Sequence, residues 1–150
     1  MSTFKTDNGG VAVSIMDAKV LTSETASTWN TRLSQIGTTN LKEKRVIICT
    51  YSLPDLEYSK QIFDKRSKNV MLIVNEKFSD KAEELRKLYP DLEIYLRADV
   101  HAKIVLVEPK TVWLSSANFG KSDWFEQTIG IHSEEVYNFY LEQINRYLNK

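Results

Sequence analysis

The sequence predicts a single α/β domain, with a mixed sheet and helices on both faces. Three observations lead to this fold class. Short apolar runs alternate with amphipathic stretches of helical spacing in the first part of the chain. From residue 92 onward, four strand-like runs follow one another closely before a last amphipathic stretch. The 150 residues are 42% hydrophobic and contain no low-complexity linker, which suits one core but not two. We therefore expect residues 1–150 to form one domain.

The N-terminal elements are predicted in chain order. Residues 11–16 have the composition of a strand, and residues 23–36 place apolar side chains on one face of a helix that Gly37 would end. Residues 45–50 predict a second strand. Residues 55–65 predict the helix after it, because polar residues and a proline stand near its start.

The next two elements complete an alternating pattern. Residues 70–74 form a continuous apolar run, which is typical of a strand that is buried on both faces. Residues 79–88 predict a helix. An order of strand, helix, strand and helix indicates a sheet that crossover helices cover.

The pattern changes in the second part of the chain. Strands are expected over residues 93–96, 102–107, 111–115 and 127–131. The turn at residues 108–110 is too short for a crossover helix, so the strands on either side of it should pair antiparallel. Residues 133–148 predict a final helix with apolar side chains at helical spacing.

Four side chains from two short segments predict the chemistry. His101 and Lys103 are two residues apart, so on a strand they project from the same face, and Ser116 and Asn118 repeat this spacing where the next strand ends. An ammonium, a hydroxyl and a carboxamide can bind a tetrahedral phosphate, and an imidazole can attack phosphorus or move a proton. A phosphodiester is therefore the expected substrate class.

The segment from His101 to Asn118, HAKIVLVEPKTVWLSSAN, resembles the HxK(x)4D(x)6GSxN motif of the phospholipase D superfamily, with every spacing kept. It is most similar to the short bacterial nucleases of that superfamily, which carry one motif per chain. Glu108 stands at the usual aspartate, and Ser115 at the usual glycine. The resemblance implies that the acidic residue has a structural role away from the nucleophile. Ser115 adds a side chain near the phosphate pocket.

The same resemblance implies a mechanism and an assembly. One histidine attacks phosphorus to give a phosphohistidine, a second protonates the leaving oxygen, and water then releases the phosphate. Such a site needs two histidine-lysine motifs, whereas this chain has one, and its other histidine, His132, has no lysine two residues later. We therefore expect a homodimer in which the two copies of His101 meet about a twofold axis. No metal and no cofactor are expected.

The resemblance also suggests supporting residues. In the family a carboxylate holds the nucleophilic histidine and supports its imidazolium form. Glu126 is the best match for that carboxylate, and Asp123 is the fallback. Lys121 is placed to meet the backbone of a substrate, and we expect Ser115 to support substrate binding.

Bulk properties limit the partners and the location. Acidic and basic residues balance at 20 each, so long-range electrostatics will not drive the whole molecule onto nucleic acid or an anionic membrane. No apolar stretch approaches the length of a membrane span, and the N-terminus is polar, so we expect a soluble cytoplasmic protein without stable membrane association. Cys49 is the only cysteine and should pack as a small hydrophobic residue.

Three functions remain open at this point. The first is a nuclease that cleaves DNA or RNA, which a compact chain with one motif favours. The second is a phospholipid-directed hydrolase or phosphatidyl transferase, although such enzymes usually carry two motifs in a longer chain. The third is a non-catalytic nucleic-acid-binding module that keeps the fold.

Three further side chains have alternative interpretations. Trp113 alternates with apolar neighbours and should lie in the core. For Trp124 we favour core packing or a dimer contact over a place at the cleft, where it would stack on a base. His132 is expected at the surface, near the start of the last helix.

Overall fold

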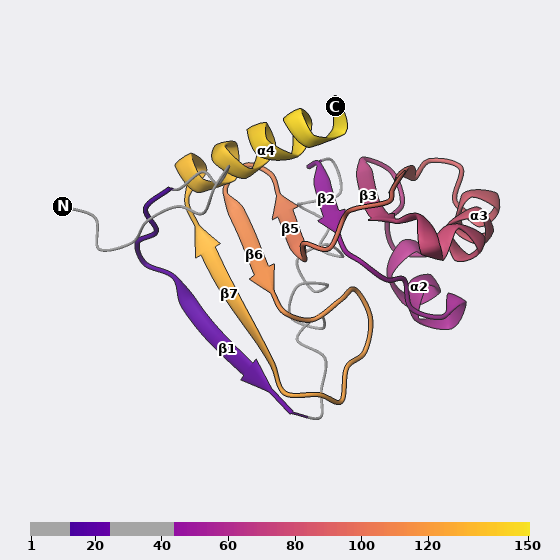
Figure 1. The fold of residues 1–150 in the computed structure, drawn as a ribbon, viewed down its shortest axis with the longest axis horizontal. Helices are drawn as coiled ribbons and strands as arrows, with labels where there is room; N and C mark the ends of the chain where they lie inside the picture. Colours follow the sequence, from indigo (N-terminus) through magenta and orange to yellow (C-terminus); the bar gives the residue numbers. More distant parts are fainter. Residues whose placement is uncertain (1–12, 25–43) are drawn as a thin grey trace.

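The computed structural model describes residues 13–24 and 44–150 (Figure 1). In chain order, the elements of this part are β1 (Lys19–Ser23), β2 (Val46–Cys49), α2 (Leu56–Phe63), β3 (Val70–Asn75), the 3-10 helix η2 (Glu76–Phe78), α3 (Ser79–Leu88), β4 (Glu93–Arg97), β5 (Ile104–Val107), β6 (Thr111–Ser115), β7 (Glu126–His132) and α4 (Glu134–Leu148). The strands form one seven-stranded sheet in the order β1-β7-β6-β5-β2-β3-β4. No helix of the described residues is long and apolar enough to cross a membrane.

The sheet is mixed, as the sequence predicts. β2, β3 and β4 run parallel, because α2 and then η2 with α3 return the chain to the same edge each time. β5 pairs antiparallel with β2 on one side and with β6 on the other. The short connection between β5 and β6 makes a hairpin, which confirms the antiparallel pairing that was expected around residues 108–110.

Helices pack on both faces of this sheet, and each face has its own core. Along β2 the side chains alternate: Val46 and Ile48 join the core that α2 and α3 complete, whereas Ile47 and Cys49 join the core beneath α4. The same alternation continues through β3 and β5. The strands at the centre therefore have no polar face, which explains the continuous apolar runs in the sequence.

Trp113 lies in the core, as predicted, and is 8% exposed. Its partner across the β6–β7 ladder is Gly130. A Cβ atom at position 130 would lie 2.6 Å from the Trp113 ring. The missing side chain at Gly130 is what lets the indole approach the neighbouring strand this closely.

Two N-terminal predictions have different outcomes. The strand expected over residues 11–16 is wrong for its described part, because residues 13–16 are not in a strand and the first strand begins at Lys19. β1 forms the edge of the sheet by pairing with β7, and Val20 is 64% exposed. The strand therefore lacks the alternation of buried and exposed residues that would reveal it in the sequence. The helix expected over residues 23–36 lies almost wholly outside the described residues, and Ser23 itself belongs to β1.

Candidate active site

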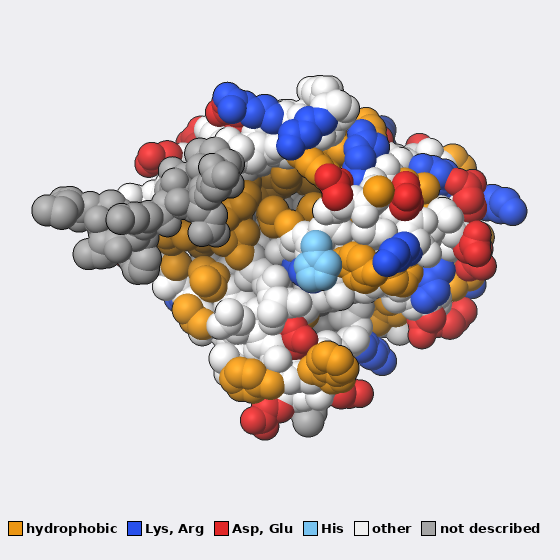
Figure 2. Space-filling view, in the orientation of Figure 1, with side chains coloured by type: hydrophobic (Ala, Val, Ile, Leu, Met, Phe, Trp, Pro, Cys, Tyr) orange, Lys and Arg blue, Asp and Glu red, His pale blue; other side chains and the backbone are white. Residues whose placement is uncertain are grey.

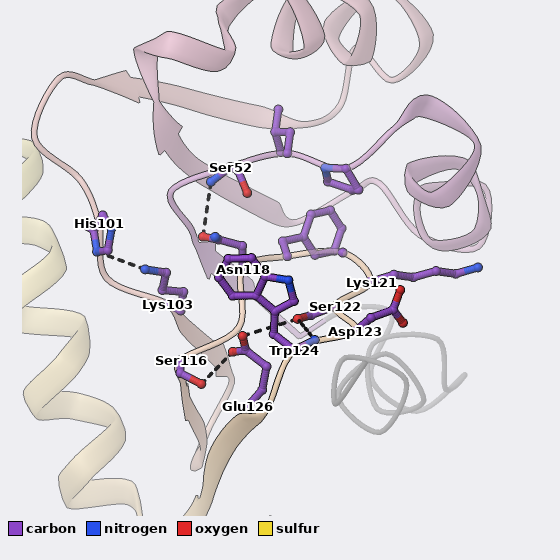
Figure 3. A pocket seen from close by; sticks show the side chains of 14 residues that line it. Ser52, His101, Lys103, Ser116, Asn118, Lys121, Ser122, Asp123, Trp124 and Glu126 are labelled. Carbon is purple, nitrogen blue, oxygen red and sulfur yellow. Dashed lines mark hydrogen bonds between the residues drawn. The ribbon is translucent and has the colours of Figure 1, made fainter. Parts of the chain in front are cut away.

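The four predicted side chains meet where three central strands end or begin. Because β5 and β6 are antiparallel, the start of β5 lies beside the end of β6, and the Ser115 N–H donates to the Lys103 carbonyl at 3.1 Å. The residues before β5 and those after β6 therefore line one cleft of about 580 Å³ (Figure 3). His101, Lys103, Ser116 and Asn118 all line it.

His101 and Lys103 lie side by side, although neither belongs to β5, which begins at Ile104. The Lys103 Nζ atom is 3.0 Å from the His101 Nδ1 atom. The His101 side chain is exposed, and the Tyr51 ring packs against it with centroids 5.1 Å apart. Burial lowers the pKa of the Lys103 ammonium, and the nearby Glu126 carboxylate partly opposes this shift.

Asn118 is fixed by the backbone at the end of β2. Its Oδ1 atom accepts hydrogen bonds from the N–H groups of Tyr51 at 3.1 Å and Ser52 at 3.4 Å. The hydroxyl of Thr50, which is fully buried, lies 3.3 Å from the same oxygen and accepts from the Phe119 N–H at 3.0 Å. With the carboxamide oxygen held in this way, the amide NH₂ is the end of Asn118 that can donate to a ligand in the cleft.

Glu126 is bound to serines in this chain. Its Oε2 atom accepts from the Ser116 hydroxyl at 2.7 Å, and its Oε1 atom accepts from the Ser122 hydroxyl at 3.4 Å. The carboxylate lines the same cleft as His101, while the hydrogen bond of the His101 ring goes to Lys103. Within one chain, Glu126 thus orients Ser116 and adds a negative charge near Lys103.

The remaining predicted site residues separate into two groups. Lys121 and Asp123 line the cleft and are exposed. Ser115 is not among the residues that line it, because its hydroxyl lies 2.8 Å from the Thr128 Oγ1 atom and donates to the Gln127 carbonyl. That hydroxyl also accepts from the backbone at residue 117, so it ties β6 to β7 rather than facing the cleft.

Trp124 corrects one interpretation. It is 79% exposed and lines the cleft, so the prediction of core packing is wrong. The loop 119–125 turns the indole outward, and Gly120 with a φ of 139° makes the bend close against Pro54. Phe125, next in the chain, is 72% exposed and does not line the cleft.

Three other side chains lie where the sequence suggested. Glu108 is at the far end of β5 from the cleft, and its carboxylate accepts from the Arg45 N–H at 3.2 Å. Cys49 is buried, and burial raises the pKa of its thiol to about 12. His132 is an exposed residue at the end of β7, immediately before Ser133, which caps α4. No cluster of three potential metal ligands occurs within residues 13–24 and 44–150.

Sequence reasoning missed the residues that hold Asn118 and Glu126 in place. Thr50, Tyr51 and Ser52 position Asn118, and Ser122 binds Glu126. The one local signal for the first group is a polar residue that directly follows a wholly apolar strand. That signal becomes useful only when β2 is known to lie beside β5, so that its end meets the start of β5.

Comparison with known proteins identifies the family of this chain. Residues 33–148 match the family model described as "Cardiolipin synthase, PLD-like domain". The chain belongs to the phospholipase D-like family. No curated protein sequence matches it.

Solved structures share the phospholipase D-like fold. Nuc from Salmonella typhimurium, described as a phospholipase D family member, is 22% identical with a TM-score of 0.63, over 89% of this chain and 94% of Nuc. NucT from Helicobacter pylori is 17% identical with a TM-score of 0.60, over 89% and 97% of the two chains. TrmBL2, an archaeal chromatin protein described as having a novel mode of DNA binding, is 13% identical with a TM-score of 0.61, over 91% of this chain and 53% of TrmBL2. At these identities the likeness establishes the fold.

Proposed function

We propose that this chain is a metal-independent phosphodiesterase, a nuclease that hydrolyses phosphodiester bonds in DNA or RNA. The observation that carries the proposal is the convergence of His101, Lys103, Ser116 and Asn118 on one cleft. Membership of the phospholipase D-like family and the likeness to Nuc support the same reaction class.

Each group has a role in this reaction. A ring nitrogen of His101 attacks phosphorus, so that an N–P bond forms while the bond to the leaving oxygen breaks. Lys103 and the amide of Asn118 donate to the non-bridging oxygens, whose negative charge grows in the transition state. The Ser116 hydroxyl donates its one proton to Glu126 in this structure, so it joins these donors only when it turns from that carboxylate to the phosphate. Water then attacks phosphorus, the N–P bond breaks, and His101 is regenerated.

The leaving oxygen needs a proton, and a second histidine must supply it. Among the described residues, His101 is the one histidine that lines the cleft. His132 is at the end of β7, and the cleft lies at the start of that strand, where Glu126 stands. A second copy of the chain would provide another His101 across a twofold axis. The exposed position of His101 at the open cleft is compatible with that assembly.

The first test is cleavage of single-stranded and duplex DNA, RNA and a chromogenic phosphodiester in excess EDTA. We expect cleavage that resists EDTA and that His101→Ala lowers on the order of 10³-fold or more. His132→Ala is the matched control and should cleave like the wild type. EDTA-sensitive cleavage, or equal activity of His101→Ala and the wild type, would refute the mechanism.

A mixing experiment tests the dimer. If each site needs both copies of His101, an exchanged equal mixture of wild type and His101→Ala contains about a quarter wild-type dimers by random pairing. The activity should then fall to about a quarter of that of the undiluted wild type. A fall to about a half would mean that each chain works alone.

One observation favours a second candidate, a phospholipid-directed hydrolase or phosphatidyl transferase. An apolar cavity of about 360 Å³ lies on the other side of His101, between the loop 99–102 and α4, with Cys49, Ile104 and Ile144 in its lining. A cavity of this character could accept part of an acyl chain. Phosphatidylglycerol and phosphatidylcholine vesicles therefore belong in the same EDTA assay. Cleavage of lipid without cleavage of nucleic acid would favour this candidate over the nuclease.

A further inference from the structure

Trp124 and Phe125 are two consecutive, exposed aromatic residues, and they differ in whether they line the cleft. Trp124 is 79% exposed and Phe125 is 72% exposed. Trp124 lines the cleft together with His101 and Lys103, whereas Phe125 does not. A tryptophan carries one of the largest apolar surfaces of any side chain, and here most of it faces water at the rim of the candidate site.

The position of Trp124 is tied to the reacting groups. Its backbone N–H donates to the Ser122 hydroxyl at 3.2 Å, and that hydroxyl donates to Glu126. Glu126 in turn accepts from the Ser116 hydroxyl on the far side, so one chain of hydrogen bonds links the tryptophan loop to Ser116 (Figure 3). These bonds place the backbone at residue 124 beside the cleft, and the Trp124 side chain lines the cleft from there.

The charge of the cleft limits how it can hold a polyanion. The cationic side chains that line it are Lys103 and Lys121, and two acidic side chains, Asp123 and Glu126, line it as well. On the face shown in Figure 2, acidic and basic side chains are interspersed and no continuous basic band crosses it. A protein that binds duplex nucleic acid without stacking on a base depends mainly on contacts between its cationic side chains and many phosphates. This cleft has two lysines for such contacts.

We propose that Trp124 is a stacking platform for an unpaired nucleobase next to the scissile phosphate, and that the substrate is single-stranded nucleic acid. This inference rests on the proposed phosphodiesterase function and names its substrate class. Base stacking on an aromatic side chain supplies affinity that needs no additional positive charge. A duplex keeps the faces of its bases covered, so it cannot use this platform without losing a stacked base pair.

The experiment measures binding with His101→Ala protein, which does not depend on cleavage. A fluorescein-labelled single-stranded oligonucleotide and its duplex are titrated with this protein, alone and combined with Trp124→Ala, Trp124→Phe or Phe125→Ala. We expect Trp124→Ala to weaken binding of the single strand about 5- to 150-fold, the equivalent of 1–3 kcal/mol per stacked base. Trp124→Phe should retain most of the affinity, and Phe125→Ala should change it less than about twofold.

An abasic series locates the base. A single abasic residue is moved along the oligonucleotide, and one position should weaken binding by the protein with Trp124 but not by Trp124→Ala. This coupling is the signature of a contact between that base and the ring. Because Trp124 is exposed, thermal unfolding of its variants should match that of the parent, so a loss of affinity is not a loss of fold.

Three outcomes overturn the inference: equal binding by all four proteins, duplex bound as tightly as single strand, or dissociation of a dimer by Trp124→Ala in sedimentation. The last would make the ring a contact between copies of the chain. Cleavage that depends on His101 but not on Trp124 would remove this inference and leave the proposed function. Binding that depends on Trp124 without any cleavage would leave the stacking inference and refute the proposed reaction.

Discussion

Thr50 provides the most direct test of how the cleft is held. Its hydroxyl is fully buried at the end of β2, accepts from the Phe119 N–H, and lies 3.1 Å from the Ser52 carbonyl and 3.3 Å from the Asn118 Oδ1 atom. A hydroxyl donates one proton, so it makes one of the last two hydrogen bonds at a time. Thr50→Val keeps the shape of the side chain and removes one accepted and one donated hydrogen bond.

The expected loss follows from those two bonds. A buried hydrogen bond contributes about 1 kcal/mol, and loss of one partner inside the core costs about 1–3 kcal/mol, so we expect Thr50→Val to lower the free energy of unfolding by about 2–4 kcal/mol. For a chain of this size that corresponds to a drop of roughly 5–15 °C in the melting temperature. The oxygen of Asn118 keeps its bonds from two backbone N–H groups, so kcat/KM for phosphodiester cleavage should fall by about tenfold rather than vanish.

Thr50→Ser is the matched control, since it keeps the hydroxyl and removes one buried methyl group. It should lose only about 1 kcal/mol and retain nearly full activity. Urea denaturation and steady-state cleavage measure both quantities. If the serine variant were as unstable and as slow as the valine variant, the methyl group rather than the hydrogen bonds would matter at this position.

Three further changes probe other features of the molecule. Gly130→Ala should lower the free energy of unfolding by about 1–3 kcal/mol, because its Cβ atom would meet the Trp113 ring at 2.6 Å, and Trp113→Leu in the same chain should recover part of this loss in urea denaturation. Equal midpoints for Gly130→Ala and the wild type would contradict the close approach. Cys49 should resist a thiol reagent at pH 8 in the folded chain and react at once in denaturant, because burial excludes the reagent and raises the pKa of the thiol to about 12; rapid labelling of the folded chain would argue against this. Burial lowers the pKa of Lys103 in the folded chain below its ordinary 10.5, so the charged form destabilises the fold fully below that lowered pKa, and the penalty declines as the pH rises from the lowered pKa to 10.5. Lys103→Met should therefore be more stable than the wild type at pH 7 and lose that advantage toward pH 10.5, whereas an equal difference at both pH values would refute this reasoning.

The α-helices and strands from β2 onward could be predicted because each leaves a local pattern in the sequence, whereas the 3-10 helix η2 was not predicted. Residues 70–74 of β3 are an unbroken apolar run that is buried on both faces, and α2 begins directly after Asp55, whose side chain accepts from the Tyr58 N–H. The N-terminal strand was misplaced for the opposite reason. β1 is held by its backbone pairing with β7, and its side chains are largely exposed, so composition alone does not locate it.

The site divides in the same way between local and distant signals. His101, Lys103, Ser116 and Asn118 lie within eighteen residues of one another, and a hairpin brings the two pairs together. Thr50 and Tyr51 reach Asn118 across separations of 68 and 67 residues, through the pairing of β2 with β5. Nothing in the sequence near position 50 predicts which strand will lie beside it, so these supporting residues could not be found without the sheet order.

The contact between His101 and Lys103 bears on how two copies of one histidine can have different roles. An ammonium group only donates, so while Lys103 is protonated the Nδ1 atom of His101 accepts, and a neutral ring carries its proton on Nε2. That form cannot attack phosphorus through Nε2, because this atom carries the proton, and it is a poor acid, because loss of the proton would leave an imidazolate. A substrate phosphate competes for Lys103, because an anionic oxygen is a better acceptor for an ammonium group than a neutral ring nitrogen. In the proposed dimer, a lysine that turns to the phosphate frees the Nδ1 atom beside it. One ring can then move its proton to Nδ1 and attack through Nε2, and the other can take up a second proton at Nδ1 and, as an imidazolium, protonate the leaving oxygen. Substrate binding would thus release both copies of His101 from Lys103 for their two roles.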